Sequence, residues 1–189
     1  MITEFSEKLF DLIKSKSFKF GDFTLSSGLK SSYYLDIKAT SLDPEGALLI
    51  GKAFAFRILE LFGKHISEIK GVGGLTLGAD PLVTATSISM FEHGHRLNAL
   101  LVRKTAKEHG TTKTVEGADF LPKNSTVIVL EDVLTTGKSA LEAAFKLREA
   151  GFRVVDVMTV VDREQGGVEA LKEHGLTTHS LFKASWFLK

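Results

Sequence analysis

The chain has 189 residues, of which 43% are hydrophobic and 25% are charged, and its formal net charge at pH 7 is +1. This length and composition fit one compact domain with a buried core and exclude a disordered chain. The near-neutral charge gives no general attraction to nucleic acid or membranes, and the lack of cysteine excludes disulfides, thiol nucleophiles and thiolate metal sites.

The first forty residues predict a helix followed by short strands. Apolar residues at helical spacing predict an amphipathic helix over about residues 3–15. Its buried face would consist of Phe5, Leu9, Leu12 and Ile13. Residues 18–40 mix aromatic and polar positions, which indicates short strands joined by a turn at 28–30. We expect a small hood, formed mainly by residues 1–40, within a single domain of residues 1–189. The absence of a continuous apolar run predicts no signal peptide or membrane span, and a cytoplasmic protein.

From residue 43 onward, predicted helices and strands alternate. Asp43 can cap a helix that starts at Pro44 and reaches about residue 62, because proline has no backbone donor to lose there. Further helices are expected at 80–93, 137–150 and 166–174. Strands are expected at 69–72, 98–102, 126–130, 154–161 and 177–182, with a glycine-rich turn at 73–78 and a polar loop at 103–114. This alternation predicts an α/β fold in which a central, mostly parallel sheet is flanked by helices.

The segment VIVLEDVLTTGKSA, residues 127–140, ends in Gly137-Lys138-Ser139, as a nucleotide-binding P-loop does. A P-loop needs a glycine at the position that Asp132 occupies in this chain. That glycine lets the backbone curl around phosphates, whereas an aspartate would repel them. The P-loop interpretation therefore fails.

What remains is a buried strand that delivers Glu131 and Asp132 to its carboxyl end, followed by a threonine-rich turn into a helix. Ligands of open parallel sheets bind at that edge. Hydroxyls and backbone amides at a helix N-terminus suit a phosphate monoester, and the acids suit hydroxyl groups or a hydrated metal. A ribose 5-phosphate combines these features. The alternative is an ordinary strand-to-helix turn whose acids face water, and the order of the whole motif favours the functional interpretation.

The segment RKTAKEHG, residues 103–110, places three permanent cations and one histidine within eight residues. A solvated helix face is one interpretation of such a charge run. The glycine and the threonines that follow favour a loop, which could close over an anion and exclude water.

Four segments resemble known families. VIVLEDVLTTG resembles the phosphoribosyl pyrophosphate (PRPP) signature of type I phosphoribosyltransferases. RKTAKEHGTTKTVEG resembles the catalytic loop of orotate phosphoribosyltransferases, whose pattern is Arg-Lys-x-x-Lys-x-His-Gly. FTLSSGLKSSYYLD and VVDREQGG resemble two further segments of the same family, the second carrying an orotate-contacting arginine. Because the four occur in the family's order between residues 23 and 167, the chain is identified as a member.

The resemblance implies the type I phosphoribosyltransferase fold and a Mg²⁺-dependent reaction of pyrimidine biosynthesis, in which PRPP and orotate give orotidine 5-monophosphate and pyrophosphate. It implies a homodimer in which the 103–114 loop is shared between subunits, with no nucleic-acid or membrane partner. The implied catalytic residues are Lys107, His109 and Asp132, with Asp132 near the magnesium ion through water.

The implied PRPP contacts divide into three groups. Pyrophosphate oxygens would be bound by Arg103, Lys104, Lys107 and His109, and ribose hydroxyls by Glu131 and Asp132. The turn around the 5-phosphate would include Val133, Leu134, Thr135, Thr136, Gly137, Lys138 and Ser139. Orotate would contact Thr135 and Arg163.

At three positions this chain differs from the residue that is common in the family or in some of its branches. Some branches carry lysine at the positions of Ser26 and Gly78, so those lysine contacts cannot be transferred. Lys138 stands where a small residue is frequent, and either adds phosphate affinity or points to solvent.

Other interpretations stay open at this point. Arg163 forms either an orotate contact or a surface ion pair with its neighbouring acids, and Tyr33 and Tyr34 either line the base pocket or pack as buried aromatics. The alternative functions are a phosphoribosyltransferase for another nucleobase and a PRPP-sensing regulator with the same fold.

Overall fold

The computed structural model describes residues 4–24, 30–105 and 113–188 of the chain. In these ranges a six-stranded sheet forms the centre of the molecule, with the strand order β5-β4-β3-β6-β7-β8. The strands are β3 (Ile69–Leu75), β4 (Asn98–Val102), β5 (Val115–Glu116), β6 (Thr126–Leu134), β7 (Asp156–Asp162) and β8 (Thr177–Lys183). Neighbouring strands are parallel except β4 and β5, which are antiparallel. The predicted α/β fold with a mostly parallel sheet is confirmed.

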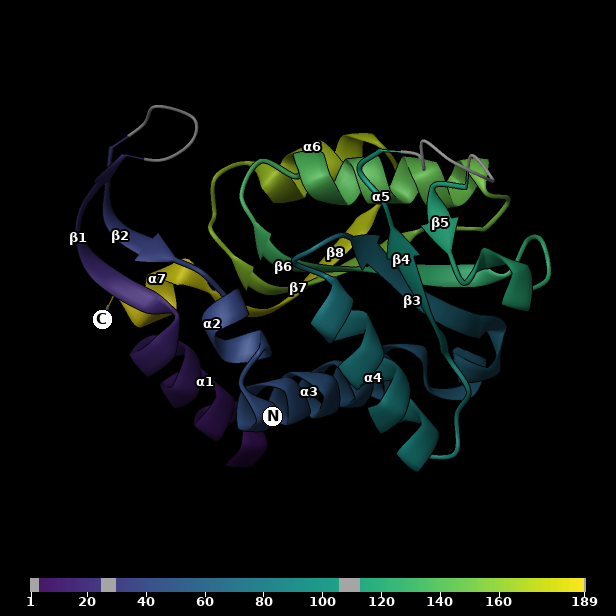
Figure 1. Ribbon diagram of the computed structural model, residues 1–189, viewed down its shortest axis with the longest axis horizontal. Helices are drawn as coiled ribbons and strands as arrows, with labels where there is room; N and C mark the ends of the chain where they lie inside the picture. Colours follow the sequence, from purple (N-terminus) through teal and green to yellow (C-terminus); the bar gives the residue numbers. More distant parts are fainter. Residues whose placement is uncertain (1–3, 25–29, 106–112, 189) are drawn as a thin grey trace.

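Helices cover both faces of the sheet (Figure 1). One layer contains α1 (Glu4–Lys16), α3 (Pro44–Phe62) and α4 (Asp80–Glu92), and the other contains α5 (Lys138–Glu149) and α6 (Gly167–Glu173). Shorter segments are α2 (Lys38–Ser41), α7 (Ala184–Phe187) and the 3-10 turns η1 (Gly63–Glu68) and η2 (Ala118–Phe120). Among the helices of the described ranges, none combines the length and the apolar character needed to cross a membrane.

The strand β6 shows why both layers are needed. Its side chains alternate between two hydrophobic clusters: Ile128 and Leu130 pack on the α3 and α4 side, whereas Val127 and Val129 pack on the α5 side. A strand buried on both faces must be apolar at nearly every position, and the run of residues 126–130 meets that requirement.

A separate two-stranded antiparallel sheet forms the hood, from β1 (Phe18–Thr24) and β2 (Lys30–Leu35). Phe18 stacks on Tyr33 of the facing strand, with ring centroids 4.8 Å apart. On another side, Phe18 stacks on the fully buried Phe187 of α7 at 5.4 Å. The hood is therefore packed against the C-terminal helix, which lies beside it in Figure 1.

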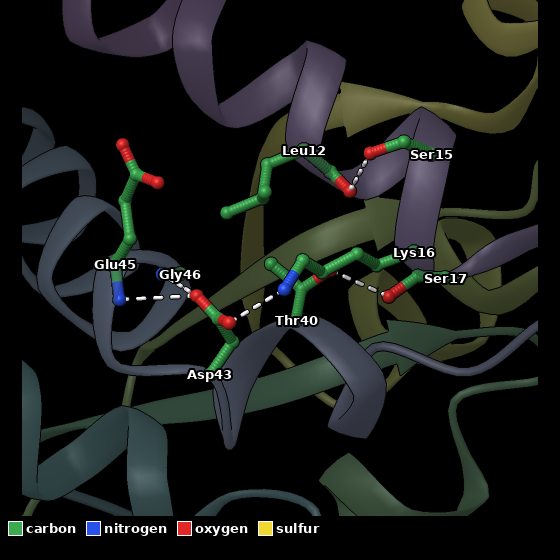
Figure 2. A network of polar contacts seen from close by, with 8 residues as sticks. All are labelled: Leu12, Ser15, Lys16, Ser17, Thr40, Asp43, Glu45 and Gly46. Atoms are coloured by element: carbon green, nitrogen blue, oxygen red, sulfur yellow. Dashed lines mark hydrogen bonds and ion pairs between the residues drawn. The ribbon is translucent and has the colours of Figure 1, made fainter.

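Figure 2 shows how the start of α3 is fixed. Asp43 Oδ1 accepts hydrogen bonds from the backbone N–H groups of Glu45 and Gly46, each at 3.0 Å, which confirms the predicted cap. Its Oδ2 accepts a bond of 2.5 Å from Lys16 Nζ. The bond from Lys16, and then that from Gly46, holds the pKa of Asp43 below its ordinary value. Close by, the hydroxyls of Ser17 and Thr40 share a buried hydrogen bond of 2.6 Å. The last turn of α1 is thus tied to the start of α3.

Several predicted boundaries were wrong, in each case because tertiary pairing overrides the local pattern. The strand β3 continues to Leu75, so that Gly73 and Gly74 lie in the sheet rather than in a turn. A Cβ on Gly74 would lie 2.4 Å from the carbonyl oxygen of Leu130, so glycine is needed for the close approach of β3 and β6. The strand β6 continues to Leu134, because its last residues still pair with β7. Glu131 and Asp132 therefore lie within the strand.

Candidate active site

A cleft of about 770 Å³ lies where β3, β4 and β6 end. Seven ionisable side chains line it. They are the carboxylates of Asp80, Glu116, Glu131 and Asp132 and the cations of Lys38, Arg103 and Lys104. A second cleft of about 650 Å³ lies between α1, α3 and β8, and its walls contain none of the predicted site residues. The charged cleft is therefore the candidate active site.

Glu131 is a buried acid in the wall of this cleft. It lies on β6 opposite Thr159 of β7 and is only 8% exposed. Burial strips water from its carboxylate and raises its pKa well above the ordinary value, and the neighbouring Asp132 raises that pKa further. Its Oε2 atom is buried and has no hydrogen-bond partner among the described residues. A buried oxygen of this kind is suited to a ligand hydroxyl.

Asp132 faces the turn after β3. Its Oδ1 accepts a hydrogen bond of 2.9 Å from the backbone N–H of Val133. A Cβ on Gly78 would lie 2.6 Å from Asp132 Oδ2. A lysine at position 78 would therefore displace the Asp132 carboxylate from its present position. The glycine that this chain has there, where some family members have lysine, leaves room for that carboxylate.

Gly78→Ala is expected to lower kcat about tenfold, because the added methyl group forces the Asp132 carboxylate to rotate away from the cleft. Initial rates at saturating substrate would measure this loss. Since the effect acts through Asp132, the double variant Gly78→Ala/Asp132→Asn should be no slower than Asp132→Asn alone. Independent, multiplying losses in this double-mutant cycle would contradict the explanation.

Three ionisable residues of the cleft, Lys38, Asp80 and Glu116, were missed by the sequence patterns. Lys38 comes from α2, where its Nζ pairs with Asp36 at 2.7 Å; this hydrogen bond, and the more distant charge of Asp132, raise its pKa. Asp80 is the first residue of α4, and burial raises its pKa. Its Oδ1 is buried without a partner among the described residues. An isolated lysine and a helix-starting aspartate have no local pattern that marks them as site residues.

The turn between β6 and α5 forms a small hollow of about 80 Å³, which borders the acid pair. The hollow is lined by Glu131 and residues 133–140. The helix α5 starts at Lys138 after Gly137, whose φ of +82° is the left-handed conformation that favours glycine. Within the described residues, no side chain caps this N-terminus. Its free N–H groups and the helix dipole are therefore available to an anion.

Lys138 is exposed and is also one of the residues that line this hollow.

The predicted cationic loop begins beside the acid pair. Arg103 Nε pairs with Glu116 Oε1 at 3.0 Å, and the Arg103 N–H donates to Thr114 O at 2.8 Å. These bonds extend the antiparallel pairing of β4 with β5 and close the base of the loop. Lys104 is exposed at the cleft. Lys107 and His109 lie outside the described residues, as does Ser26 in the hood.

Arg163 follows β7 and lies beneath the hood. Its backbone N–H donates to Leu134 O at 2.8 Å, which places it next to the phosphate turn. Its guanidinium carbon lies 4.8 Å from the ring centroid of Tyr33, and the residue is only 8% exposed. The interpretation as a surface ion pair is therefore wrong. Its Nε and Nη2 atoms are buried and lack hydrogen-bond partners in the described part of the chain.

The two tyrosines differ in environment. Tyr33 is buried between Phe18 and Arg163, whereas Tyr34 is 42% exposed and tilts against Phe23 at 5.6 Å. Packing thus accounts for Tyr33, and it also orients the Arg163 guanidinium.

The acid pair, the uncapped start of α5 and the hood meet around one sheet edge, and this combination defines a type I phosphoribosyltransferase. Over 181 residues the chain is 45% identical to the orotate phosphoribosyltransferase of Nostoc sp., a match that covers 96% of this chain and 84% of that protein. The chain belongs to the orotate phosphoribosyltransferase family.

Further comparisons agree. The orotate phosphoribosyltransferase of Aquifex aeolicus is 44% identical over 185 residues, covering 96% of this chain and 97% of that protein. The crystal structure of Mycobacterium tuberculosis orotate phosphoribosyltransferase in complex with PRPP superposes with a TM-score of 0.77 at 34% identity, covering 98% of this chain and 99% of that one. A scan against protein-family models gave no match.

Proposed function

We propose that this chain transfers the ribose 5-phosphate of PRPP to orotate and releases pyrophosphate, forming orotidine 5-monophosphate in pyrimidine biosynthesis. The observation that carries the proposal is the meeting of an acid pair, an uncapped helix N-terminus and a set of cations in one cleft. Membership of the orotate phosphoribosyltransferase family over nearly the whole chain supports orotate as the base.

In this proposal the sugar phosphate is held by the end of β6 and the start of α5. The 5-phosphate accepts hydrogen bonds from the N–H groups and hydroxyls of Thr135–Ser139. The ribose hydroxyls bond to Glu131 and Asp132. Glu131, which burial biases toward its neutral form, can both donate to a hydroxyl and accept from one. Two fixed groups thus orient C1 of the ribose toward the base.

The pyrophosphate leaves on the side of Arg103 and Lys104. Breaking its bond to C1 builds positive charge on the sugar and negative charge on the leaving group, so that fixed cations stabilise the transition state more than the ground state. Lys107 and His109 are proposed to act on the same oxygens. Lys38 of α2 also lines the cleft and adds a further cation there.

Orotate is proposed to bind under the hood. The buried N–H groups of Arg163 that lack a partner among the described residues suit a carboxylate, to which an arginine fork can donate two parallel hydrogen bonds. Thr135 is the next residue after Leu134, whose carbonyl holds the Arg163 backbone. The base would therefore lie between Arg163 and the phosphate turn.

A magnesium ion fits the oxygen donors of this cleft. Mg²⁺ prefers oxygen ligands and retains several waters. Asp132 would hold it through water. Glu131 and Asp80 also line this cleft, and each has one buried carboxylate oxygen without a partner among the described residues. When bound, the ion would offset the negative charge of the pyrophosphate group, to which PRPP oxygens would contribute the remaining ligands.

We further propose a homodimer in which the 103–114 loop is shared between subunits, with the cytoplasm as the compartment. The family resemblance supports the dimer. Light scattering of the purified chain tests the assembly, and localisation of a tagged chain tests the compartment.

The direct test of the reaction is to mix the chain with PRPP, Mg²⁺ and orotate and to follow the loss of orotate absorbance, with hypoxanthine and uracil as parallel substrates. We expect orotate to be consumed as pyrophosphate is released, and a chelator to slow the reaction. No orotate consumption, or faster use of another base, would overturn the proposed function.

A further inference from the structure

Lys146 connects α5 to the base of the cationic loop. Its Nζ donates to the carbonyl oxygens of Arg103 and Lys104, both at 2.8 Å. The third partner is Glu142 Oε1, at 2.6 Å, one turn earlier on the same helix. An ammonium group has three N–H donors, so all three are used. The Lys146 side chain is only 17% exposed and does not line the cleft.

The two carbonyls are unusual partners for one ammonium. Successive carbonyls of an extended strand point to opposite sides, so a single donor reaches two of them only where the chain bends. The backbone does bend at residues 104–105, directly after β4. Charge-assisted hydrogen bonds to both carbonyls hold that bend. The charge of Lys146 is balanced by Glu142, so the group contacts the backbone without drawing an anionic ligand toward itself.

The position of Lys146 along α5 links two parts of the site. The helix starts at the phosphate turn, and Lys146 lies eight residues after Lys138, the first helical residue. At 1.5 Å per residue, the two points are about 12 Å apart on one rigid helix. The same helix therefore carries the phosphate hollow at its start and the support for Arg103 and Lys104 farther along.

We propose that Lys146 is a positioning residue for pyrophosphate recognition: it fixes the bend at residues 104–105 so that Arg103 and Lys104 face the cleft at a set distance from the phosphate turn. This role rests on the proposed function, because it concerns the pyrophosphate end of PRPP. Both ends of PRPP would thereby be positioned relative to one helix, α5.

The test uses Lys146→Met, which keeps the apolar stem and removes the ammonium. Titration calorimetry would measure the affinities for PRPP, for pyrophosphate and for orotidine 5-monophosphate, which has the 5-phosphate but no pyrophosphate. We expect PRPP and pyrophosphate to bind about tenfold more weakly and orotidine 5-monophosphate to bind within about twofold of the original affinity. Lys146→Arg should restore most of the loss, since a guanidinium can donate to two carbonyls.

Lys123→Met is the matched control. Lys123 Nζ donates to Ala150 O at 2.6 Å, so that variant also loses a bond from lysine to a carbonyl, at the far end of α5 and outside the cleft. We expect all three affinities to stay unchanged. If Lys146→Met does not fold, Lys146→Gln, which removes the charge and keeps two of the three N–H donors on a shorter side chain, replaces it.

The possible outcomes separate the two proposals. Equal loss of affinity for all three ligands would assign Lys146 a general structural role and overturn the positioning role, as would unchanged pyrophosphate affinity in a folded variant. If the unmodified chain binds PRPP and pyrophosphate but does not consume orotate, the proposed function fails while the positioning role is still decided by the pyrophosphate titration. A chain that binds neither ligand would overturn both.

Discussion

Replacement of Arg163 by methionine is expected to lower kcat/KM for orotate about 1,000-fold, because a buried carboxylate would lose its charged hydrogen-bond donor. The Arg163 guanidinium lies against Tyr33 of the hood. The bond to Leu134, a residue of the sugar-phosphate hollow, is made by the Arg163 backbone N–H and is kept when the side chain is replaced. PRPP affinity should therefore stay within about twofold, since the phosphate turn is intact. Steady-state kinetics with orotate as the varied substrate, together with calorimetric titration of PRPP, would measure the two effects.

Two companion variants make this prediction specific. Arg163→Lys keeps the charge but loses the planar fork, so it should recover only part of the activity. Arg153→Met removes an arginine that is exposed, and should leave both parameters unchanged. A comparable loss of PRPP affinity in Arg163→Met would show that the arginine supports the whole cleft rather than the base.

Glu131→Gln is expected to lower kcat at least about 100-fold and, at the same time, to stabilise the unliganded chain at alkaline pH. The pKa of Glu131 is raised in the folded chain, first by burial and then by Asp132. Above the ordinary glutamate pKa, the unfolded chain therefore releases a proton that the folded chain retains. Stability is fully present below that pH and falls as the pH rises toward the folded pKa. Glutamine does not titrate, so the variant escapes this loss.

Thermal unfolding at pH 5 and pH 8 would measure the effect. The melting temperature of Glu131→Gln, relative to the original chain, should be higher at pH 8 than at pH 5. Glu169→Gln, which changes an exposed glutamate on α6, should show no such trend. Melting temperatures that vary with pH in parallel for the original chain and Glu131→Gln would contradict a raised pKa at this residue.

Where a strong local signal exists, the fold was predictable from the sequence. The pair Asp43-Pro44 marks the start of α3, and the structure places the helix at Pro44 with the aspartate capping it. The predicted strand at residues 98–102 agrees with β4. The end of β6 was placed too early because the acids at positions 131 and 132 resemble a break. Pairing of Val133 and Leu134 with β7 extends the strand beyond them.

Site residues whose positions depend on tertiary packing were harder to predict from the sequence. The surroundings of Arg163 could not be inferred from its acidic neighbours, because its burial is created by Tyr33, which is 130 positions earlier in the chain. Lys38 reaches the cleft from α2, which is far in sequence from the strands β4 and β6 that form the cleft. The Lys146 contacts span more than forty positions and involve backbone carbonyls, which no side-chain motif encodes. The roles of Lys107 and His109 stay predictions.

The order of the strands divides recognition between neighbouring segments of the chain. The acids and the phosphate turn belong to β6 and the start of α5, whereas Arg163 follows β7. In the proposed site, sugar-phosphate binding and base selection are consequently encoded largely by separate, short stretches, which are joined by the pairing of β6 with β7 and by the hydrogen bond from the Arg163 N–H to Leu134 O. A new base preference can then be engineered by exchanging the segment after Asp162 and its hood partners, while the donor half of the site is left unaltered.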